Sequence, residues 1–358
     1  MSRSIKGRGA AVQPANSYQP VNLQADLEQV ADDEEYLAEL GRPPTEYLPD
    51  LSQTIVTEND SPDLGFRYSV NPYRGCSHGC SYCYARPTHE YLGLSAGLDF
   101  ETKVFVKFGA AGLLRDFLAR PAWRPETIVF SGVTDCYQPA ERGFKITRSC
   151  LEVAAECRQP VGVITKNALV LRDLDLLKSL AEHRAVRASL SITSLDPRLA
   201  RVMEPRTSAP EARLRAIREL SAAGIPTSVM VAPIIPGLND SEMPAILAAA
   251  REAGARSAGY VLLKLATIVR EVFLDWLQRN YPDRLPRIET LIRSTRAGRL
   301  NDSTFGRRQR GTGPVADLIA DTFALWTAKL GYPDDDEPLN VEAFRPPQPT
   351  GGQLRLFD

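Results

Sequence analysis

The sequence lacks several features that would assign it to a class at once. It contains no run of about 18 apolar residues, so no transmembrane helix is expected. Its first twenty residues, MSRSIKGRGAAVQPANSYQP, contain no apolar h-region and therefore do not resemble a secretory signal. Six cysteines among 358 residues do not suggest a disulfide framework. These absences predict a cytoplasmic protein in which clustered cysteines are metal ligands.

A strong net charge is also missing, since the formal net charge is −1. The charge is nevertheless uneven, because residues 1–63 carry 12 acidic and 4 basic side chains. The segment 284–310 is basic, with only Glu289 and Asp302 to balance Arg284, Arg287, Arg293, Arg296, Arg299, Arg307, Arg308 and Arg310. Two interpretations of this segment are open. It is either a solvated face with internal ion pairs or a phosphate-binding surface.

Apolar, β-branched runs alternate with helical patterns from Phe66 onwards. The runs that predict strands are 66–70, 127–133, 161–165, 188–193, 226–233 and 259–263. The helical patterns are 109–119, 143–158, 171–183, 209–224 and 241–254. Strands that alternate with helices at this spacing form parallel β/α units. The sequence therefore predicts an α/β fold, an open partial (β/α)6 barrel, with a doubly wound sheet as the alternative.

Four regions are expected from composition. Residues 1–63, rich in Pro, Asp, Glu and Gln, predict an acidic and largely disordered arm. Residues 64–265 are expected to form the barrel, and residues 266–332 a helical, arginine-rich extension. Residues 333–358 predict a flexible tail. In either architecture, the functional site lies at the carboxyl ends of the strands.

The stretch NPYRGCSHGCSYCYARP, residues 71–87, holds three cysteines within eight residues: Cys76, Cys80 and Cys83. A structural zinc site and an ordinary electron-transfer cubane each need four ligands. Three thiolates without an obvious fourth therefore describe a metal centre with one open position. The stretch follows the first predicted strand, which places it at the mouth of the barrel.

Two other metal sites are considered. A zinc site would be completed by His78 or His89. A ferredoxin-like cluster would take Cys136, Cys150 or Cys157 as its fourth ligand. Cys150 and Cys157 are seven residues apart on a predicted helix, a spacing that is typical of small buried hydrophobic residues on one face.

The Cys-x3-Cys-x2-Cys spacing, Tyr82 just before Cys83 and the barrel pattern together resemble the radical S-adenosylmethionine (SAM) superfamily. The resemblance covers residues 66–265. It implies that the three cysteines bind a [4Fe–4S] cluster and that SAM occupies its fourth iron. It also implies reductive cleavage of SAM to methionine and a 5′-deoxyadenosyl radical, with electrons from a donor such as flavodoxin or ferredoxin.

Within that superfamily, four stretches are similar to the spore photoproduct lyase and DNA repair photolyase branch: NPYRGCSHGCSYCYAR, GVTDCYQPAE, ITKN and APIIPGLND. The flanking RPTHEYLGLSAGLDFETKVFVK is similar to a bacterial subfamily of this branch without a settled substrate. The resemblance implies that SAM is held at Tyr82, Gly132, Thr134, Asp135, Lys166, Ser191 and Arg206. The Gly-Gly-Glu motif usual in the superfamily is absent at 132–135. Lys166, Ser191 and Arg206 are each also compatible with a role in capping the end of a strand.

Cys136, in the stretch TDCYQ, is a candidate for a chemical role. In spore photoproduct lyases, a cysteine in this region donates a hydrogen atom that closes the radical cycle. The resemblance implies such a donor at Cys136 facing the barrel mouth, with Tyr137 as a relay. The alternative is an incidental cysteine.

The chain ends in QLRLFD, residues 353–358, after a Pro/Gly-rich linker. This ending resembles the short peptide by which bacterial DNA polymerases and repair proteins bind the sliding clamp. Gln353 would bind at the rim of the clamp's site, and the apolar side chains of Leu354, Leu356 and Phe357 would fill its pockets. The alternative is a chain end that docks into the protein's own core.

Together these features predict a radical SAM enzyme whose substrate is DNA, with a damaged or modified base as the target. One alternative keeps the chemistry and changes the substrate to RNA, a protein side chain or a small metabolite. Another is a non-catalytic, DNA-associated metal-binding protein.

Overall fold

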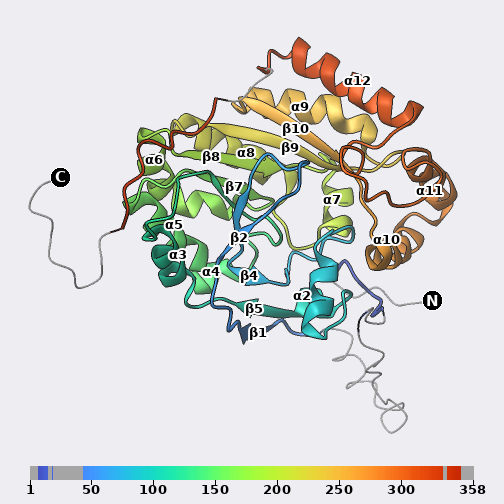
Figure 1. Ribbon diagram of the computed structural model, residues 1–358. Coiled ribbons are helices and arrows are strands. Elements are labelled where there is room, and N and C mark those ends of the chain that lie inside the picture. The colour runs from blue at the N-terminus through green and yellow to red at the C-terminus, as the bar shows by residue number, and fades with distance from the viewer. Residues whose placement is uncertain (1–6, 15–17, 19–42, 334–336, 348–358) are drawn as a thin grey trace, which may run out of the picture.

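In the computed structural model, residues 7–14, 18, 43–333 and 337–347 are described. A curved seven-stranded sheet forms the centre, with strand order β10-β9-β8-β7-β6-β3-β2 (Figure 1). Six of these strands are parallel and follow one another in chain order, while β2 pairs antiparallel with β3 at one edge. The predicted open (β/α)6 barrel is confirmed, because a doubly wound sheet would reverse the strand order in its middle.

The strands of the large sheet agree closely with the apolar runs. They are β2 (Val56–Glu58), β3 (Tyr68–Val70), β6 (Ile128–Phe130), β7 (Val161–Thr165), β8 (Val186–Ser191), β9 (Thr227–Ile234) and β10 (Ser257–Leu262). The strand β6 is shorter than the predicted 127–133 because Ser131 has a φ of 78°, a left-handed conformation that ends the extended backbone.

A second sheet, which the sequence did not predict, has the order β1-β5-β4. Its strands are β1 (Glu46–Pro49), β4 (Tyr73–Arg74) and β5 (Lys103–Val106). β1 runs parallel to β5, and β4 runs antiparallel to it. This sheet is the lower layer in Figure 1. Its strand β4 leads directly into residues 75–85, which contain the three cysteines and are called the cysteine loop.

Helices cover the outer face of the large sheet and one end of it (Figure 1). The outer helices are α3 (Ala110–Leu118), α4 (Glu141–Phe144), α5 (Ile146–Glu156), α6 (Leu174–Glu182), α8 (Pro210–Ala222) and α9 (Met243–Glu252). The helix α7 (Pro197–Met203) instead packs with Cys80 and α10. The helical extension consists of α10 (Thr267–Asn280), α11 (Leu285–Ser294) and α12 (Pro314–Lys329). Shorter elements are α2 (Asp99–Thr102), η2 (Arg86–Leu92), η3 (Ala168–Asp173), η4 (Asp240–Glu242) and η5 (Pro282–Arg284).

The single helix expected over 143–158 is divided into α4 and α5. Lys145, between them, has a φ of 54°, so the helical hydrogen-bond ladder is interrupted there. Glu141 supports this corner, because its carboxylate accepts hydrogen bonds from the backbone N–H groups of Thr147 and Arg148. Periodicity alone does not reveal such a turn, since apolar residues continue on both sides of it.

The N-terminal arm also differs from the expectation for residues 1–63. Residues 8–10 are buried, and β1 and β2 belong to the two sheets. In the tail, residues 337–347 lie along the barrel, where the N–H of Arg345 donates to the carbonyl of Cys157 and that of Asn340 to the carbonyl of Arg184. These contacts use backbone N–H and carbonyl groups, so the amino-acid composition of the tail does not predict them. The terminal QLRLFD peptide lies outside the described residues.

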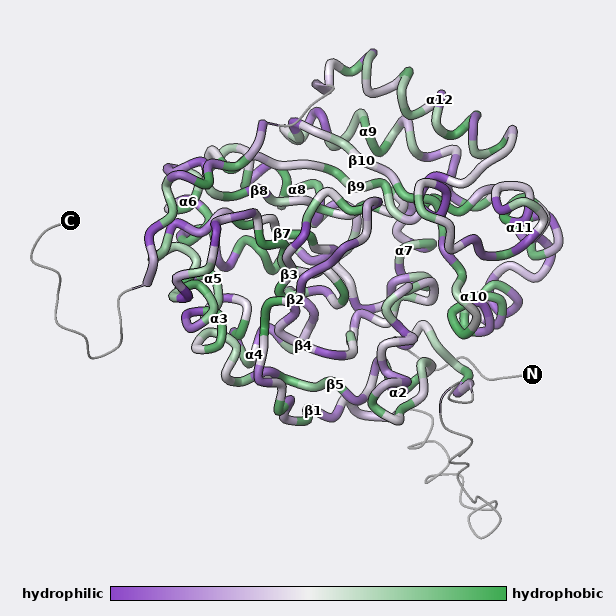
Figure 2. The backbone as a smooth tube through the Cα atoms, in the orientation of Figure 1, coloured by the Kyte–Doolittle hydropathy of each residue, from purple (hydrophilic) through white to green (hydrophobic). Residues whose placement is uncertain are grey.

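The main core lies between the large sheet and its outer helices, where hydrophobic residues line β3 and β7 (Figure 2). Cys150 and Cys157 belong to this core at 0% and 1% exposure, as small buried side chains. A second apolar cluster joins Cys80 and Tyr82 to α10 and α11. The extension therefore packs directly against the cysteine loop.

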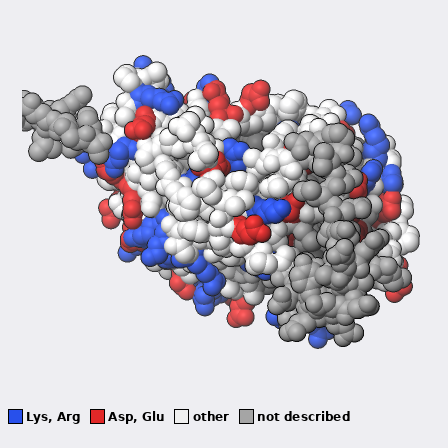
Figure 3. Space-filling view, turned by 90° about the horizontal axis from the view of Figure 1, so that it is seen from below, with Lys and Arg blue, Asp and Glu red and all other residues white. Residues whose placement is uncertain are grey.

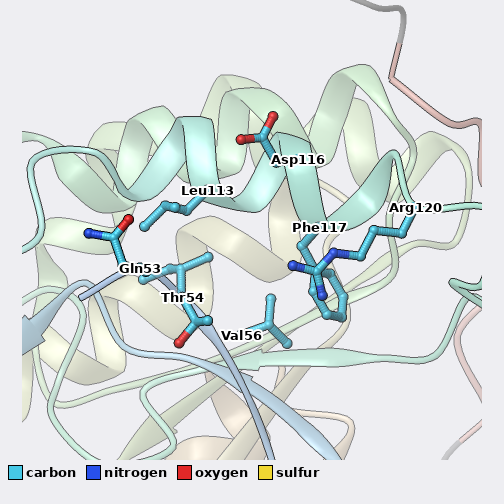
Figure 4. Close-up of a pocket in the computed structure, with 8 residues that line it drawn as sticks. Gln53, Thr54, Val56, Leu113, Asp116, Phe117 and Arg120 are labelled. Carbon is cyan, nitrogen blue, oxygen red and sulfur yellow. The ribbon is translucent and has the colours of Figure 1, made fainter.

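A cavity of about 140 Å³ lies between the residues preceding β2 and the helix α3 (Figure 4). It is lined by Gln53, Thr54, Ile55, Val56, Leu113, Asp116, Phe117 and Arg120. None of the candidate site residues contributes to its lining. Among the described helices, none is long and apolar enough to cross a membrane.

Candidate metal centre

The cysteine loop follows β4 and ends at η2, on the side of the sheet where β3 reaches its carboxyl end. Cys76 and Cys80 are buried, Cys83 is partly exposed, and all three thiols are free of disulfide bonds. Gly79 has a φ of 69°, and a Cβ there would lie 2.8 Å from the carboxylate of Glu101. Only glycine fits this turn between the first two cysteines.

Buried polar side chains hold the backbone of the loop. The guanidinium of Arg86 donates to the carbonyl of Cys80 and to the carbonyls of Ala96 and Gly97. Gln138, which follows β6, donates to the carbonyl of Gly75 and accepts from the N–H of Ser77 at 3.0 Å. The loop is therefore fixed through its carbonyl and N–H groups, which leaves the three sulfurs available as ligands.

Burial keeps the free thiols protonated, while two nearby cations act in the opposite direction. Burial raises the pKa of the Cys80 thiol, and negative charge at Glu204 raises it further, whereas Lys166 acts in the opposite direction. Burial also raises the pKa of Cys83, against which the charges of Arg86 and Lys166 act. Metal binding must displace these thiol protons, and the two cations favour the charged product. Three soft thiolates beside two cations fit an iron–sulfur cluster.

The histidines considered as zinc ligands have other partners. The Nδ1 of His78 lies 3.5 Å from Asp135 Oδ2, and its Nε2 lies 3.2 Å from Asn167 Nδ2. His89 Nε2 lies 2.9 Å from the carbonyl of Lys103. These contacts argue against a cysteine–histidine zinc site. Within the described ranges, no group of three or more His, Cys, Asp or Glu side chains, the three cysteines included, is already arranged around a single metal ion.

We expect His89 to make the protein less stable in acid. Burial lowers its pKa from 6.5 to about 4. The unfolded chain therefore binds a proton below pH 6.5, and the folded protein does not until about pH 4. Stability is full above pH 6.5 and should fall by about 3 kcal/mol as the pH decreases to 4. Urea unfolding of metal-free His89→Phe at pH 7, 5.5 and 4.5 should show a shallower loss than wild type.

The control for this experiment is His183→Gln, at the end of α6. Its pH profile should follow that of the wild type. Equal losses in wild type and His89→Phe would contradict the assignment.

Tyr82 belongs to a buried network below the loop. Its hydroxyl donates to the carboxylate of Glu204, which also accepts hydrogen bonds from Thr193 and Arg213. Lys166 Nζ lies 5.9 Å from the centroid of the Tyr82 ring. Burial raises the pKa of Glu204, but the charges of Arg213 and Lys166, together with the hydrogen bonds from Thr193 and Tyr82, lower it overall. The network holds Tyr82 in place and brings Lys166 near Cys80 and Cys83.

The three expected SAM-binding residues after β6 have contacts within the protein. Asp135 Oδ1 accepts from Thr165 Oγ1 at 2.7 Å, and its Oδ2 accepts from the N–H of Lys166 at 2.8 Å. Thr134 Oγ1 donates to the carbonyl of Tyr73 at 2.8 Å. Gly132 lies so close to Ser69 that a Cβ would approach its side chain to 2.7 Å. Asp135 therefore joins the ends of β6 and β7 and positions Lys166.

Ser191 and Arg206 occupy different surroundings. Ser191 is buried at the end of β8, and its carbonyl accepts from Arg213 at 2.9 Å. The side chain of Arg206 donates from Nε to the carbonyl of Gly7 at 3.0 Å and from Nη1 to Thr45 Oγ1 at 3.3 Å. Arg206 thus binds the N-terminal segment, and a role in holding SAM is not supported. Nothing in the sequence indicated this contact between residues 199 positions apart.

Cys136 and Tyr137 do not face the mouth of the barrel. Cys136 is 0% exposed and belongs to the main core, where Thr147 Oγ1 donates to its carbonyl at 2.6 Å. Tyr137 is also 0% exposed, and its hydroxyl donates to Asp173 at 3.0 Å. A hydrogen-atom donor must reach a substrate radical, and both of these side chains are enclosed in the core. This burial favours a packing role for Cys136 over the expected donor role.

Replacing Cys136 by alanine should accordingly leave SAM cleavage and substrate turnover within about twofold of wild type. The loss of a small buried side chain should lower the free energy of unfolding by about 1 kcal/mol. Product analysis under single-turnover conditions checks this result. Retained SAM cleavage with lost product formation would instead restore the donor role.

Two residues at the mouth were missed by the sequence analysis. Tyr84 directly follows Cys83, is 52% exposed, and donates from its hydroxyl to the carbonyl of Gly132 at 3.0 Å. Lys264, just after β10, places Nζ 5.0 Å from the centroid of the Tyr84 ring. An aromatic residue directly after the last cysteine was the only available signal in the sequence. These contacts link the cysteine loop to both β6 and β10.

The arginine-rich segment is partly structural. Arg296 is buried and donates to the carbonyls of Leu262 and Leu263. Arg293 pairs with Glu289, and Arg308 pairs with Asp63 at 2.6 Å. Where described residues are in view on the face seen from below, basic and acidic side chains are mixed (Figure 3). A phosphate-binding surface, if confined to this segment, would use only part of its arginines.

Comparisons with known proteins agree with this geometry. The Radical SAM superfamily model matches residues 70–250. An uncharacterized protein of Mycobacterium bovis is 41% identical over 232 residues, covering 64% of this chain and 68% of the relative. An uncharacterized protein of Methanocaldococcus jannaschii is 30% identical over 219 residues, which are 61% of this chain and 78% of that relative.

Solved structures of spore photoproduct lyase share the fold. The lyase complexed with dinucleoside spore photoproduct has a TM-score of 0.58 at 17% identity, covering 79% of this chain and 78% of that chain. A mutant form of spore photoproduct lyase has a TM-score of 0.59 at 17% identity, covering 88% of this chain and 85% of that chain.

Proposed function

This chain belongs to the radical SAM superfamily, and from that premise we propose that it acts on a base of single-stranded or locally opened DNA. As a superfamily member, it uses a [4Fe–4S] cluster and SAM, and it requires an electron donor. The observation that carries the DNA proposal is the composition of the mouth beside the cysteine loop. There, an exposed tyrosine and a lysine lie together at the carboxyl ends of the strands.

The residues of this chain have separable tasks in such an enzyme. Cys76, Cys80 and Cys83 would hold the cluster, and Lys166 would pair with the carboxylate of SAM. When bound, the cluster and SAM supply one-electron chemistry that yields a 5′-deoxyadenosyl radical. Arg86 keeps the loop in position through the carbonyl of Cys80, while the packing of α10 and α11 on Cys80 and Tyr82 excludes water. Exclusion of water protects a reactive radical from side reactions.

The mouth offers groups that suit a nucleotide. Tyr84 presents a half-exposed ring for stacking, and base–aromatic stacking is worth about 1–3 kcal/mol per base. Burial lowers the pKa of Lys264, and the charges of Arg308 and Arg296 lower it further. The charge of Asp63 acts in the opposite direction, but among the described residues no carboxylate forms an ion pair with Lys264, and a phosphate would offset the remaining repulsion. Next to it, the guanidinium of Arg308 lies 4.6 Å from the centroid of the exposed Phe305 ring.

The fold comparison points in the same direction by analogy. The lyase with the similar fold was solved in complex with dinucleoside spore photoproduct. A base in a duplex must leave the stack before its atoms are reached, and a lesion lowers that cost. A damaged or modified pyrimidine is therefore the favoured target.

The test measures binding of a fluorescent single-stranded oligonucleotide to the cluster-loaded protein between about 50 and 200 mM salt. We expect affinity to fall steeply with salt, because phosphate contacts release counterions. Lys264→Gln should weaken binding and reduce the slope by about one. The matched control Lys178→Gln, an exposed lysine on the outer helix α6, should change neither quantity.

Binding without salt dependence, or none, would overturn the DNA proposal. In that case, 5′-deoxyadenosine formation would direct the search to RNA, a protein side chain or a small metabolite. Iron bound without any SAM cleavage would instead support a non-catalytic metal-binding protein.

The QLRLF ending supports a second proposal, binding to the bacterial sliding clamp in the cytoplasm. Deleting residues 353–358 should abolish association with purified clamp in a gel-filtration assay, because Leu354, Leu356 and Phe357 supply the apolar anchors. SAM cleavage should be unchanged. A Gln353→Ala, Phe357→Ala variant that retains full clamp binding would contradict this proposal.

A further inference from the structure

An N-terminal segment lies against the outer side of the cysteine loop. We call residues 7–14 the N-terminal strap. Its residues Arg8, Gly9 and Ala10 are buried, although they precede the barrel by more than fifty residues. The strap is held from two directions, since Arg206 donates to the carbonyl of Gly7 at 3.0 Å and Arg8 donates to the carbonyl of Glu101 at 2.8 Å.

The strap approaches the loop backbone too closely for side chains. A Cβ on Gly9 would lie 1.8 Å from the carbonyl oxygen of Gly79 and 3.0 Å from the backbone nitrogen of Ser81. Further along, a Cβ on Gly97 would lie 2.2 Å from the carbonyl oxygen of Val12. The strap therefore packs against two glycines outside it, Gly79 and Gly97. Of these, Gly79 lies between Cys76 and Cys80 in the sequence. Such close backbone packing excludes water from that side of the loop.

A buried carboxylate connects the strap to the loop. Glu101 is 0% exposed, and it accepts from the N–H of Gly9 at 3.2 Å and from the N–H of Ala10 at 2.8 Å. The same carboxylate pairs with Arg86, which in turn donates to the carbonyl of Cys80. Displacing the strap thus removes two hydrogen bonds from the carboxylate that anchors the loop's arginine.

We propose that the N-terminal strap closes the outer side of the cysteine loop and limits the access of oxygen, chelators and thiol reagents to the three cysteines. The barrel mouth is then left as the route for SAM and substrate. The part of this inference that concerns protection of a cluster rests on the proposed function. The contacts between the strap and the loop do not depend on it. The strap acts as a positioning and shielding element and does not itself bind SAM.

The test compares Gly9→Ala with the matched control Gly112→Ala. Gly112 lies in α3, and a Cβ there would meet nothing within 4 Å. In metal-free protein, alkylation of Cys76, Cys80 and Cys83 by iodoacetamide is followed by mass spectrometry. Gly9→Ala should accelerate this alkylation at least about tenfold, because the strap opens locally, whereas Gly112→Ala should leave the rate unchanged. Unchanged rates in Gly9→Ala would overturn the proposal.

Alkylation of Cys150 and Cys157, which are buried in the main core, reports global unfolding in the same samples. If these two core thiols also become reactive in Gly9→Ala, that variant has unfolded globally, and Arg8→Gln is tested in its place. That variant removes the hydrogen bonds from Arg8 to Glu101, Pro43 and Thr45 without adding volume. Arg8→Gln must then show the same selective increase in the alkylation rate of Cys76, Cys80 and Cys83. If the rate does not increase, the proposal is overturned.

A second readout uses reconstituted protein. Gly9→Ala should bind as much iron as wild type without oxygen but lose its visible absorption at least about tenfold faster in the presence of a chelator. Equal rates of loss would contradict the shielding role. If the wild type binds no cluster at all, the proposed function fails, and the alkylation experiment alone still decides the role of the strap.

Discussion

Cys76→Ala should abolish both cluster assembly and 5′-deoxyadenosine formation. The variant retains two of the three thiolates, and the loop offers no replacement ligand, because His78 is held between Asp135 and Asn167. Iron should fall from about four per chain in reconstituted wild type to a small, labile residue. Product formation with SAM and a strong reductant should fall below detection. Anaerobic iron and sulfide analysis, followed by chromatography of the reaction, measures both quantities.

The matched control is Cys150→Ala, which removes a thiol that is equally buried but lies on α5 in the main core. It should retain iron and activity. Loss of cluster in Cys150→Ala would mean that a core cysteine takes part in ligation, as a ferredoxin-like site requires. Activity retained in Cys76→Ala would contradict the assignment of the loop as the metal centre.

Glu101→Ala should lower the free energy of unfolding by about 3–5 kcal/mol, because it leaves a buried guanidinium without its counter-charge. Arg86 and Glu101 are both 0% exposed, and the carboxylate also accepts from the N–H groups of Gly9 and Ala10. These donors would become unsatisfied in a region closed to water. The measurement is urea unfolding of metal-free protein at pH 7.

Glu156→Ala provides the matched control, since its ion pair with Arg115 is partly exposed, with the Glu156 side chain at 45% exposure. An exposed pair of this kind is worth about 0–1 kcal/mol. Similar losses for both substitutions would show that the pair below the cysteine loop gains little from burial. A loss for Glu101→Ala below about 1 kcal/mol would also remove the energetic link between strap and loop.

Local sequence patterns predicted the parallel strands well, because a strand buried on both faces must be apolar along its length. The strand β7 has the predicted bounds, 161–165, whereas β6 is shorter than expected since Ser131 leaves the extended conformation. The division of α4 and α5 at Lys145 was missed for a similar reason. A single left-handed residue changes the course of the chain without changing the apolar period.

Side-chain roles were harder to predict than elements. Lys166 lies near Cys80 and Cys83, since it follows the end of β7 directly, and its expected contact with SAM stays a prediction. Arg206 was expected near SAM but binds Gly7, and Cys136 was expected at the mouth but is buried in the core. A residue a few positions beyond a strand can turn towards the core, the mouth or another segment. The choice depends on partners that are distant in the chain.

The sequence by itself determined the barrel, because strand periodicity is a local property that survives without knowledge of distant contacts. Its cysteine motif indicated the cluster chemistry through resemblance to the radical SAM superfamily. Only the tertiary structure decided which groups surround the cysteines. Arg86 directly follows the loop, but Glu101 and the N-terminal strap reach it from other parts of the chain. Their convergence results from backbone packing around glycines and from the need to pair every buried charge, and neither requirement can be evaluated before the chain is folded.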